Sequence, residues 1–311
     1  MKKTIITSLT ALLAFLICAC DQEQPIDTDQ YPQSVYIVGA HDRIITRELN
    51  LGYDQDTLNL SIAVSGSLSL SQDVGVEIEL CPEAIDAYNA REINPNFRQY
   101  RALDPATFTM PSSQVTVKKG EVYHTLPIYI NPSSLQLDSL YMLAFRIKQT
   151  TAYEPSATDT VCLVNLAQVN SYSGQYYMNG VIKNVDNEAD SMVYVMPRKL
   201  TALRDGRTVR MYHYRNEWSD GYNSDYRPDW TFTISVNDDN SVTLAPIENF
   251  NIISYHGQYY PEMKAFYLDY VASYDGRTWR TRGFLYKERS TTADQHAIVD
   301  WMEDMKSKLG F

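Results

Sequence analysis

The chain has 311 residues, a formal net charge of −11 and 24 tyrosines. This length suits two domains of ordinary size. A chain this acidic lacks the broad basic field through which proteins bind nucleic acid or anionic lipid, so neither is expected as a partner through charge.

The first twenty residues, MKKTIITSLTALLAFLICAC, have two lysines, then an apolar run, then small residues. The run from Ile5 to Cys18 is too short for a transmembrane helix and is typical of a secretory signal peptide. Its end resembles a bacterial lipobox, which predicts removal of residues 1–19 and acylation of Cys20. Cys18 fits the lipid-bearing position less well, and a plain signal peptide with incidental cysteines is the alternative. We expect contact with the membrane through this lipid anchor only.

Residues 20–33 are expected to form a tether between the lipid and the folded body. The segment DQEQPIDTDQYPQ (21–33) is polar and contains two prolines. Fully extended, it would reach roughly 40 Å. The acidic residues directly after Cys20 resemble the surface-export signal of Bacteroides-type lipoproteins, which implies an outer-membrane protein that faces the cell exterior. Removal of residues 1–19, which carry two lysines and no acidic residue, would change the net charge to −13.

Residues 34–169 are predicted to form an all-β domain. Short segments such as LPIYI alternate apolar and polar residues and are separated by turns. About seven such strands in sequence suggest an antiparallel β-sandwich of immunoglobulin-like type. The predicted strands cover residues 34–40, 57–64, 73–80, 114–120, 121–131, 140–148 and 158–167. The segment 81–103 interrupts this rhythm and is expected to hold a short helical turn at 83–90.

Two cysteines remain after the signal peptide, Cys81 and Cys162. The apolar residues that alternate from Val74 to Leu80 are the expected core face of their strand, so Cys81 would point the other way. Exported proteins can form disulfides. Two buried free thiols are the favoured state, and a Cys81–Cys162 disulfide is the open alternative. No cysteine or histidine spacing typical of a metal site is present.

Residues 170–311 are predicted to form a second all-β domain that begins after the turn at NSYSG. Asp238-Asp239-Asn240 and Asp275-Gly276 are hairpin signals between apolar runs. Seven or eight antiparallel strands in sequence favour a meander that closes as a small barrel. The predicted strands cover residues 174–182, 190–197, 207–215, 230–236, 241–247, 265–273 and 277–288.

The chain is expected to end in an amphipathic helix that Thr292 or Asp294 can cap. Apolar residues recur at helical spacing on one face. They are Ile298, Trp301, Met302, Met305 and Leu309. Trp301 is therefore interpreted as core packing rather than as part of a site.

The segment LDPATFTMPSSQVTVKKGEVYHTLPIYIN, followed by LDSLYMLAFRI, resembles a family of Bacteroidetes lipoprotein N-terminal domains called domain of unknown function 1735. The family's pattern is matched by Pro105, Phe108, Val115, Val117, Gly120, Tyr141 and Ile147. The second half, from YSGQYYMNG to RTWRTRGFLYKE, is similar to domain of unknown function 4361, which has a lipocalin-like barrel. These patterns are specific for fold, and they carry over no catalytic residue. The resemblance implies a place beside outer-membrane glycan importers, and hence glycan capture.

Two aromatic segments are the predicted ligand-binding surface. Sugars present apolar C–H faces that stack on Trp and Tyr rings, and polar side chains bind their hydroxyls. In EWSDGYNSDYRPDW (217–230) and ISYHGQYYPE (253–262), Gly, Asn, Asp and Pro are expected to keep the backbone irregular. The candidate ligand-binding residues are Trp218, Asp220, Tyr222, Tyr226, Trp230, Tyr255, Tyr259 and Tyr260. The alternative is that these rings close a barrel end and are buried, an interpretation that Trp230 favours; Trp279 is expected to pack in a hairpin.

An enzyme needs a placed nucleophile, an acid–base pair or a metal. The five histidines are scattered, and no G-x-S-x-G, Walker or G-x-G-x-x-G motif is present, so we expect neither catalysis nor a cofactor. A glycoside hydrolase needs only two carboxylates in a cleft, with Glu217 and Asp220 or Asp225 as the first candidates. The acidic turn at residues 186–190 lacks the EF-hand spacing and is interpreted as solvated rather than calcium-binding.

Together, these patterns predict a cell-surface lipoprotein that binds a polysaccharide or oligosaccharide without converting it. Components of an outer-membrane glycan importer are the expected protein partners. One alternative is a structural or adhesion subunit that binds a protein through edge strands or the same aromatic surface. The second alternative is a glycoside hydrolase. A lipocalin-like cavity is also able to hold an apolar ligand.

Overall fold

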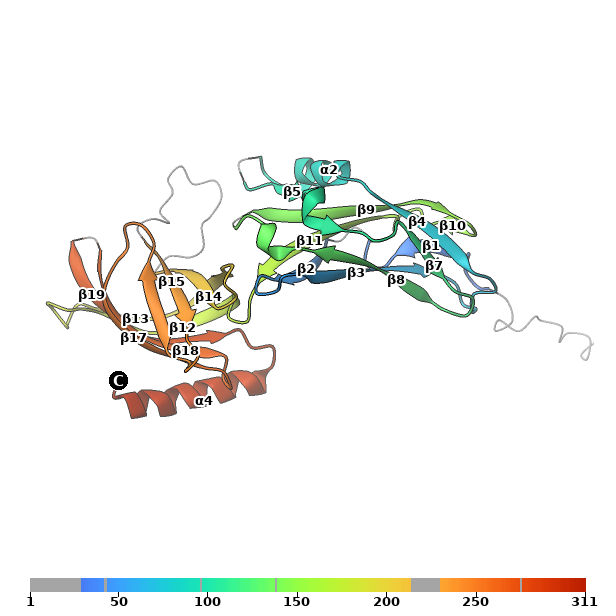
Figure 1. Cartoon of the computed structure of the whole chain (residues 1–311). Helices are drawn as coiled ribbons and strands as arrows, with labels where there is room; N and C mark the ends of the chain where they lie inside the picture. The colour runs from blue at the N-terminus through green and yellow to red at the C-terminus, as the bar shows by residue number, and fades with distance from the viewer. Residues whose placement is uncertain (1–28, 42–43, 96, 138, 214–229, 275) are drawn as a thin grey trace, which may run out of the picture.

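A computed structural model describes residues 29–41, 44–95, 97–137, 139–213, 230–274 and 276–311. In this part of the chain a β-sandwich is followed by a curled β-sheet with a helix on its outer wall, and Figure 1 shows the two domains arranged end to end. The predicted all-β architecture of a sandwich, a barrel and a C-terminal helix is confirmed. The last long strand of the sandwich ends at Val169, and the first strand of the barrel begins at Gly174.

The sandwich packs two sheets around one apolar core. The first sheet contains, in spatial order, β10 (Glu154–Pro155), β1 (Ser34–Ile37), β3 (Asp56–Val64), β8 (Tyr123–Ile130) and β6 (Phe108–Thr109). The second contains β2 (Ile44–Asn50), β11 (Val161–Val169), β9 (Leu140–Thr150), β4 (Val74–Leu80) and β7 (Gln114–Val117), with β5 (Tyr100–Ala102) beside β9. The connections hold helix α2 (Glu83–Glu92) and the short 3-10 helices η1 (Pro105–Thr107) and η2 (Pro132–Ser134). Helix α2 confirms the helical turn predicted at 83–90.

The two cysteines lie on either side of the second sheet, Cys81 directly after β4 and Cys162 in β11. The alternating residues of β4 from Val74 to Ile78 face the core as predicted, but Leu80 is exposed because β7 accompanies β4 only as far as Glu77. Cys81 follows with its side chain on the opposite face, where it is buried beneath α2. Cys162 lies in the core between the two sheets. The thiols are therefore on opposite faces of one sheet, and both are free rather than joined in a disulfide.

The sequence pattern did not predict strand β2. Its central residues, Thr46-Arg47-Glu48, are polar and interrupt the alternation. The strand forms nevertheless, because it pairs in parallel with β11 along its whole length at the edge of the sheet. An edge strand gains its backbone hydrogen bonds from one neighbour and leaves more of its side chains in water, so its sequence needs little apolar character.

The C-terminal domain is an eight-stranded antiparallel sheet curled into a nearly closed barrel. Its strands lie in the order β16 (Val242–Pro246), β15 (Thr231–Val236), β14 (Thr208–Tyr212), β13 (Ser191–Ala202), β12 (Gly174–Asn184), β19 (Arg277–Lys287), β18 (Ala265–Tyr274) and β17 (Asn251–Tyr260). A bridge between Ser241 and Gln258 brings the two ends of the sheet together. Apart from β12 and β19, the first and last strands of the domain, which pair with each other, neighbouring strands around the barrel are consecutive in the chain, as in the predicted meander.

The turns of the barrel follow the sequence signals in part. The predicted hairpins connect β15 to β16 and β18 to β19, and Asn240 and Gly276 in these turns have φ of 63° and 70°. Residues 253–262, by contrast, were expected to be irregular, and that prediction is wrong. They belong largely to β17, which pairs with β18 and has one register shift between Ile252 and Ser254. Tyrosine-rich sequence suits the half-buried surface of a sheet, and this preference outweighs the local turn residues.

Helix α4 (Thr292–Leu309) covers one outer wall of the barrel, as Figure 1 shows. The helix is capped by Thr291, whose hydroxyl accepts from the Asp294 N–H, and not by Thr292 or Asp294 as predicted, because both of those residues lie inside the first turn. Ile298 and Met302 are buried against the sheet, and Trp301 packs beside them, so the predicted apolar face is confirmed.

The two domains meet at one end of the barrel, which we call the near end. The Asn170 side-chain amide donates to the Thr208 carbonyl at 2.8 Å, and the Arg204 guanidinium donates to the Leu135 carbonyl at 2.8 Å. Groups from both domains also line a cavity of about 230 Å³ at this junction. The far end of the barrel, where β12 turns into β13 and β18 into β19, points away from the sandwich (Figure 1).

Candidate functional site

Five rings gather at the far end of the barrel. They belong to His213, Trp230, Phe250, Tyr274 and Trp279, and we call this group the aromatic mouth. His213 directly follows β14, and Trp230 directly precedes β15, so these two residues flank the segment 214–229. The mouth is therefore built where the sequence has its densest mixture of aromatic and acidic residues.

The rings of the mouth contact one another in series. His213 stacks on Trp230 with ring centroids 6.1 Å apart and an interplanar angle of 4°. Its ring centroid also lies 4.8 Å from that of Tyr274 and 5.1 Å from that of Phe250. Tyr274 in turn stacks on Trp279 at 6.0 Å. Trp230 is buried, whereas Tyr274 and Trp279 are half-buried, so the cluster reaches the surface on the side of the β18–β19 hairpin.

A layer of buried polar side chains lies beneath the mouth. We call it the polar layer; its members are Tyr194, Arg198, Tyr270 and Thr281. His213 connects the two groups, because its Nδ1 shares a hydrogen bond of 2.5 Å with the Tyr270 hydroxyl. The Tyr194 hydroxyl is buried and has no hydrogen-bond partner among the described residues. Inside a β-barrel, such a hydroxyl can form its missing hydrogen bond with a ligand or a water molecule.

A pair of glycines makes room for Tyr194. Gly180 of β12 lies opposite Gly283 of β19 in the sheet. A Cβ atom at Gly180 would lie 2.9 Å from the Tyr194 hydroxyl oxygen and 2.3 Å from the backbone oxygen of Arg282. Because neither glycine has a side chain, the Tyr194 side chain has room to lie over this part of the barrel wall.

Burial controls the charge of the groups around the mouth. It lowers the pKa of His213 to about 3, with a further contribution from Arg198, so the imidazole is neutral near pH 7. Burial also lowers the pKa of Arg198 and raises the pKa values of Tyr194 and Tyr270. The two phenols therefore keep their protons and can donate hydrogen bonds. Neutral hydroxyl and imidazole groups beside stacked rings suit the recognition of a hydroxyl-rich ligand.

Four of the predicted ligand-binding residues, Trp218, Asp220, Tyr222 and Tyr226, lie outside the described residues, as do the hydrolase candidates Glu217 and Asp225. Trp230 is part of the mouth, and its burial agrees with the interpretation of this residue as core. Trp279 packs in its hairpin as expected and also forms the rim of the mouth.

The structure does not bring Tyr259 and Tyr260 of the second aromatic segment to the mouth. Tyr259 is buried at the near end, where its ring centroid lies 5.0 Å from that of Tyr172. Tyr260 turns to the outer wall and meets Trp301 of α4 edge-on at 5.1 Å. Tyr255 is exposed on β17, opposite Tyr270 in the sheet register. Because these residues lie on a strand, alternation sends Tyr259 and Tyr260 to opposite faces, so they cannot form one outward-facing surface.

Sequence reasoning missed His213, Phe250 and Tyr274 as members of a site. Alternation along β14 places His213 on the inner face with Val209 and Met211, so the burial of His213 could have been predicted from the sequence pattern. Its stacking partner Trp230 lies on the other side of an intervening segment, and no local pattern reports that contact. Phe250 comes from the β16–β17 connection, where a single aromatic residue carries no distinctive signal.

No group of three or more His, Cys, Asp or Glu side chains within the described ranges is placed to hold a metal ion. At the acidic turn considered for calcium, Asp190 accepts a hydrogen bond from the Asn184 amide at 3.2 Å and forms an ion pair with Arg277 at 3.3 Å. These contacts tie the acidic turn to neighbouring strands of the barrel.

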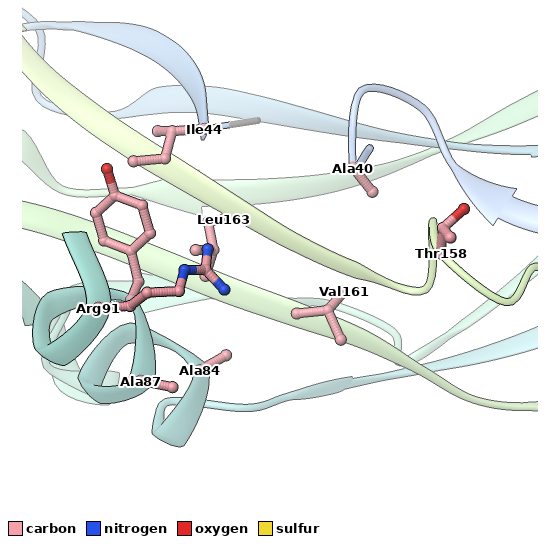
Figure 2. A pocket seen from close by; sticks show the side chains of 9 residues that line it. Ala40, Ile44, Ala84, Ala87, Arg91, Thr158, Val161 and Leu163 are labelled. Atoms are coloured by element: carbon pink, nitrogen blue, oxygen red, sulfur yellow. The ribbon is translucent and has the colours of Figure 1, made fainter. Parts of the chain in front are cut away.

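A second hollow lies on the sandwich, between α2 and the outer face of the second sheet. Its volume is about 240 Å³, and its floor includes Ile44, Val161 and Leu163. Figure 2 shows the Arg91 side chain extending from α2 over this floor, with Thr158 at the opposite side. The hollow is smaller than most ligand pockets and has no stacked rings.

Two family models match the chain. One, described as an N-terminal domain, matches residues 31–154, and the other, described as C-terminal, matches residues 160–286. In the comparison with curated proteins, none matches this chain. Neither α2 nor α4, the α-helices of the described residues, has the length and hydropathy needed to cross a membrane.

Several solved structures from Bacteroides share the fold. A Bacteroides ovatus protein of unknown function is 17% identical, with a TM-score of 0.60 over 82% of this chain and 94% of that chain. A multidomain Bacteroides ovatus protein that includes DUF1735 is 16% identical, with a TM-score of 0.59 and the same coverage. An auxiliary nutrient binding protein from Bacteroides thetaiotaomicron is 14% identical, with a TM-score of 0.52 over 78% of this chain and 89% of that chain. The likeness extends to the fold alone, and it agrees with the resemblance of the N-terminal half to domain of unknown function 1735.

Proposed function

We propose that this chain is a lipoprotein of the outer membrane that binds a polysaccharide or oligosaccharide at the cell surface without converting it. The observation that carries the proposal is the aromatic mouth above the polar layer. A pyranose ring can stack its C–H face on the half-buried rings of Tyr274 and Trp279, while buried hydroxyls bind its polar groups. The description of a structure of similar fold as an auxiliary nutrient binding protein supports this interpretation.

The same proposal assigns a role to each part of the chain. Residues 1–19 direct export, and Cys20 carries the lipid. Of the predicted tether, residues 20–33, the part before Asp29 connects the lipid to the sandwich, because hydrogen bonds from Ser67 and Leu68 attach Asp29 to that domain. The sandwich, residues 34–169, spaces the barrel, residues 170–311, from the membrane. The partners are the components of a glycan importer, which would receive the captured ligand.

Binding makes fewer demands on this site than hydrolysis does. A retaining or inverting glycosidase needs two carboxylates in its cleft. None of the residues that form the mouth and the polar layer, as defined above from the described chain, is a carboxylic acid. The hydrolase alternative therefore depends on Glu217 and Asp220 or Asp225, and it predicts that the protein releases new reducing ends from the glycan it binds.

One observation favours a second candidate function, the binding of a protein partner. Val193 and Val195 are exposed on the outer face of β13. In the described chain, β14 pairs with β13 only at Thr201 and Ala202, so most of this edge of β13 has no neighbouring strand there. Strand edges with apolar side chains are surfaces on which another chain can add a strand.

Affinity electrophoresis tests the glycan proposal. The mature chain, residues 20–311 with Cys20→Ser to prevent acylation, is run through gels that contain plant, fungal or host polysaccharides. We expect one of these glycans to retard the protein and Tyr274→Ala and Trp218→Ala to reduce the retardation. Tyr123→Ala is the matched control, because Tyr123 is an exposed tyrosine on the sandwich, far from the mouth. Retardation by none of the glycans, together with retention by outer-membrane proteins that is lost in Val193→Asp, would favour the protein-binding alternative.

A further inference from the structure

The described chain enters the sandwich at the end opposite the barrel. The Asp29 carboxylate accepts hydrogen bonds from the backbone N–H groups of Ser67 and Leu68 at 2.9 and 3.0 Å. The Gln30 N–H donates to the Ser67 hydroxyl at 2.9 Å. These bonds fasten the start of the described chain to the connection between β3 and β4. Figure 1 shows β1, which follows, and the β7–β8 turn at this end of the sandwich, with the barrel at the other end.

Four large apolar side chains are exposed at this same end, and we call them the tether-end surface. They are Tyr31, Leu68, Val122 and Tyr123. Backbone hydrogen bonds hold their segments together: the Val64 N–H donates to the Val122 carbonyl at 3.2 Å, and the Gly120 N–H donates to the Leu70 carbonyl at 3.1 Å. Tyr31 is 72% exposed and Val122 is 68% exposed, so neither side chain serves the core. Exposed apolar residues gathered in one place indicate an interaction surface.

The carboxylates among these side chains already have donors. Asp73 accepts from the Lys118 ammonium and from the Lys119 N–H, each at 2.8 Å. Glu121 accepts from the Lys118 N–H at 3.1 Å. Asp29 is held by backbone groups, as described above. Carboxylates that keep their hydrogen bonds within the protein lose less solvation free energy when the surface approaches lipid headgroups than free carboxylates would.

We propose that the tether-end surface rests on the lipid bilayer. This inference depends on the proposed acylation of Cys20. The eight residues between Cys20 and Asp29 reach at most roughly 30 Å, so an acylated chain would hold this end of the sandwich close to the membrane. Tyrosine rings are favoured at the level of lipid headgroups, and aliphatic side chains such as Leu68 and Val122 gain from contact with the acyl boundary. With this end on the bilayer, the aromatic mouth faces away from it.

A fluorescent label at Val122→Cys tests the proposal. The native thiols of Cys81 and Cys162 are buried, so the introduced thiol is labelled alone. In the mature chain a hexahistidine tag replaces Cys20 and is bound by nickel-chelating lipid in vesicles of phosphatidylethanolamine and phosphatidylglycerol. This link holds the N-terminus at the bilayer whether or not the natural protein is acylated. Val193→Cys is the matched control, because Val193 is 75% exposed at the far end of the barrel.

We expect the emission of the label at position 122 to shift to the blue on vesicles and to be quenched by brominated lipid. The emission of the label at position 193 should stay that of a label in water, with and without vesicles. Leu68→Ser with Tyr123→Ser should abolish the shift at position 122 without unfolding the chain, because both side chains are exposed. Water-like emission at both positions would overturn the proposal. A shift at position 122 that requires added outer-membrane proteins would also overturn it and assign the surface to a protein partner. Absence of lipid on Cys20 in the natural protein would instead contradict the proposed function, and mass spectrometry measures it separately.

Discussion

The hydrogen bond between His213 Nδ1 and the Tyr270 hydroxyl crosses the interior of the barrel. Three strands separate β14, which His213 follows, from β18, which carries Tyr270, so the bond spans the interior rather than joining neighbouring strands. Both side chains are buried, and the imidazole also stacks on Trp230. His213 thus connects the aromatic mouth to the polar layer, and a substitution at His213 should alter the packing of the mouth and the hydrogen bonding of the polar layer.

Acid should destabilise the protein through His213. Its pKa is about 3 in the folded chain, whereas a histidine in an unfolded chain has its ordinary pKa of 6.5. Between these values the unfolded chain binds a proton that the folded chain does not. The free energy of unfolding therefore falls as the pH drops below 6.5, by up to about 1.4 kcal/mol per pH unit. Urea denaturation at several pH values should show a shallower fall for His213→Phe, which keeps a ring but cannot titrate. His256→Gln, at an exposed position on β17, is the control, and an unchanged slope in His213→Phe would contradict the assignment.

Removing one ring from the rim of the mouth should weaken glycan binding. Tyr274→Ala deletes a stacking surface that contacts both His213 and Trp279, and we expect a loss of affinity of about tenfold or more. Isothermal titration with the glycan that retards the protein measures this change. Circular dichroism must show the variant folded, and Tyr123→Ala should bind as the unmodified chain does. Equal affinity of Tyr274→Ala and the unmodified chain would remove Tyr274 from the site.

Gly180→Ala should destabilise the barrel. The added methyl group would lie 2.3 Å from the Arg282 backbone oxygen and 2.7 Å from the Gly283 Cα, and neither atom belongs to a flexible side chain. We expect a loss of about 1–3 kcal/mol in the free energy of unfolding, the usual effect of overpacking. Chemical denaturation measures it, with Asn179→Ala, on the outer face of the same strand, as the control. A loss as small as that of the control would mean that the two strands separate without strain.

The two thiols should be inert in the folded protein. Burial raises the pKa of Cys81 to about 11 and that of Cys162 to about 12, so neither forms an appreciable amount of thiolate near pH 8. In the Cys20→Ser chain, a thiol reagent should react with both cysteines only after denaturation. Electrophoretic mobility should be the same with and without reductant. A mobility change on reduction would indicate the Cys81–Cys162 disulfide that the sequence left open.

Acylation at Cys20 has a direct test. Cells that produce the full-length chain should place it in the outer-membrane fraction, and its N-terminal peptide should carry the mass of the lipid. Cys20→Ser should move the protein to the soluble fraction, whereas Cys18→Ser should leave it with the membrane if Cys20 bears the lipid. Membrane association of Cys20→Ser would contradict the assignment of the lipid to Cys20.

The sequence by itself determined the division into domains of β-strands, most strand positions and the C-terminal helix. Each of these follows from local chemistry: period-two alternation along Leu126, Ile128 and Ile130 marks a strand, and apolar residues at helical spacing mark α4. Hairpin signals such as Asp238-Asp239-Asn240 act over a few residues and are recognisable directly. The export signal and the tether lie largely outside the described residues and stay predictions.

Only the tertiary structure decided which rings meet. Trp230 contacts His213 across segment 214–229, and Tyr274 joins them from a strand far along the chain, so no window of sequence contains the mouth. Backbone pairing also overruled local signals: β18 gives residues 251–260 a hydrogen-bonded partner, which turns a predicted loop into a strand and sends Tyr259 and Tyr260 to opposite faces. The edge strand β2 forms because β11 supplies its hydrogen bonds. Contacts between distant segments and the backbone hydrogen bonds of neighbouring strands are properties of the folded chain, and for that reason the site emerged only with the fold.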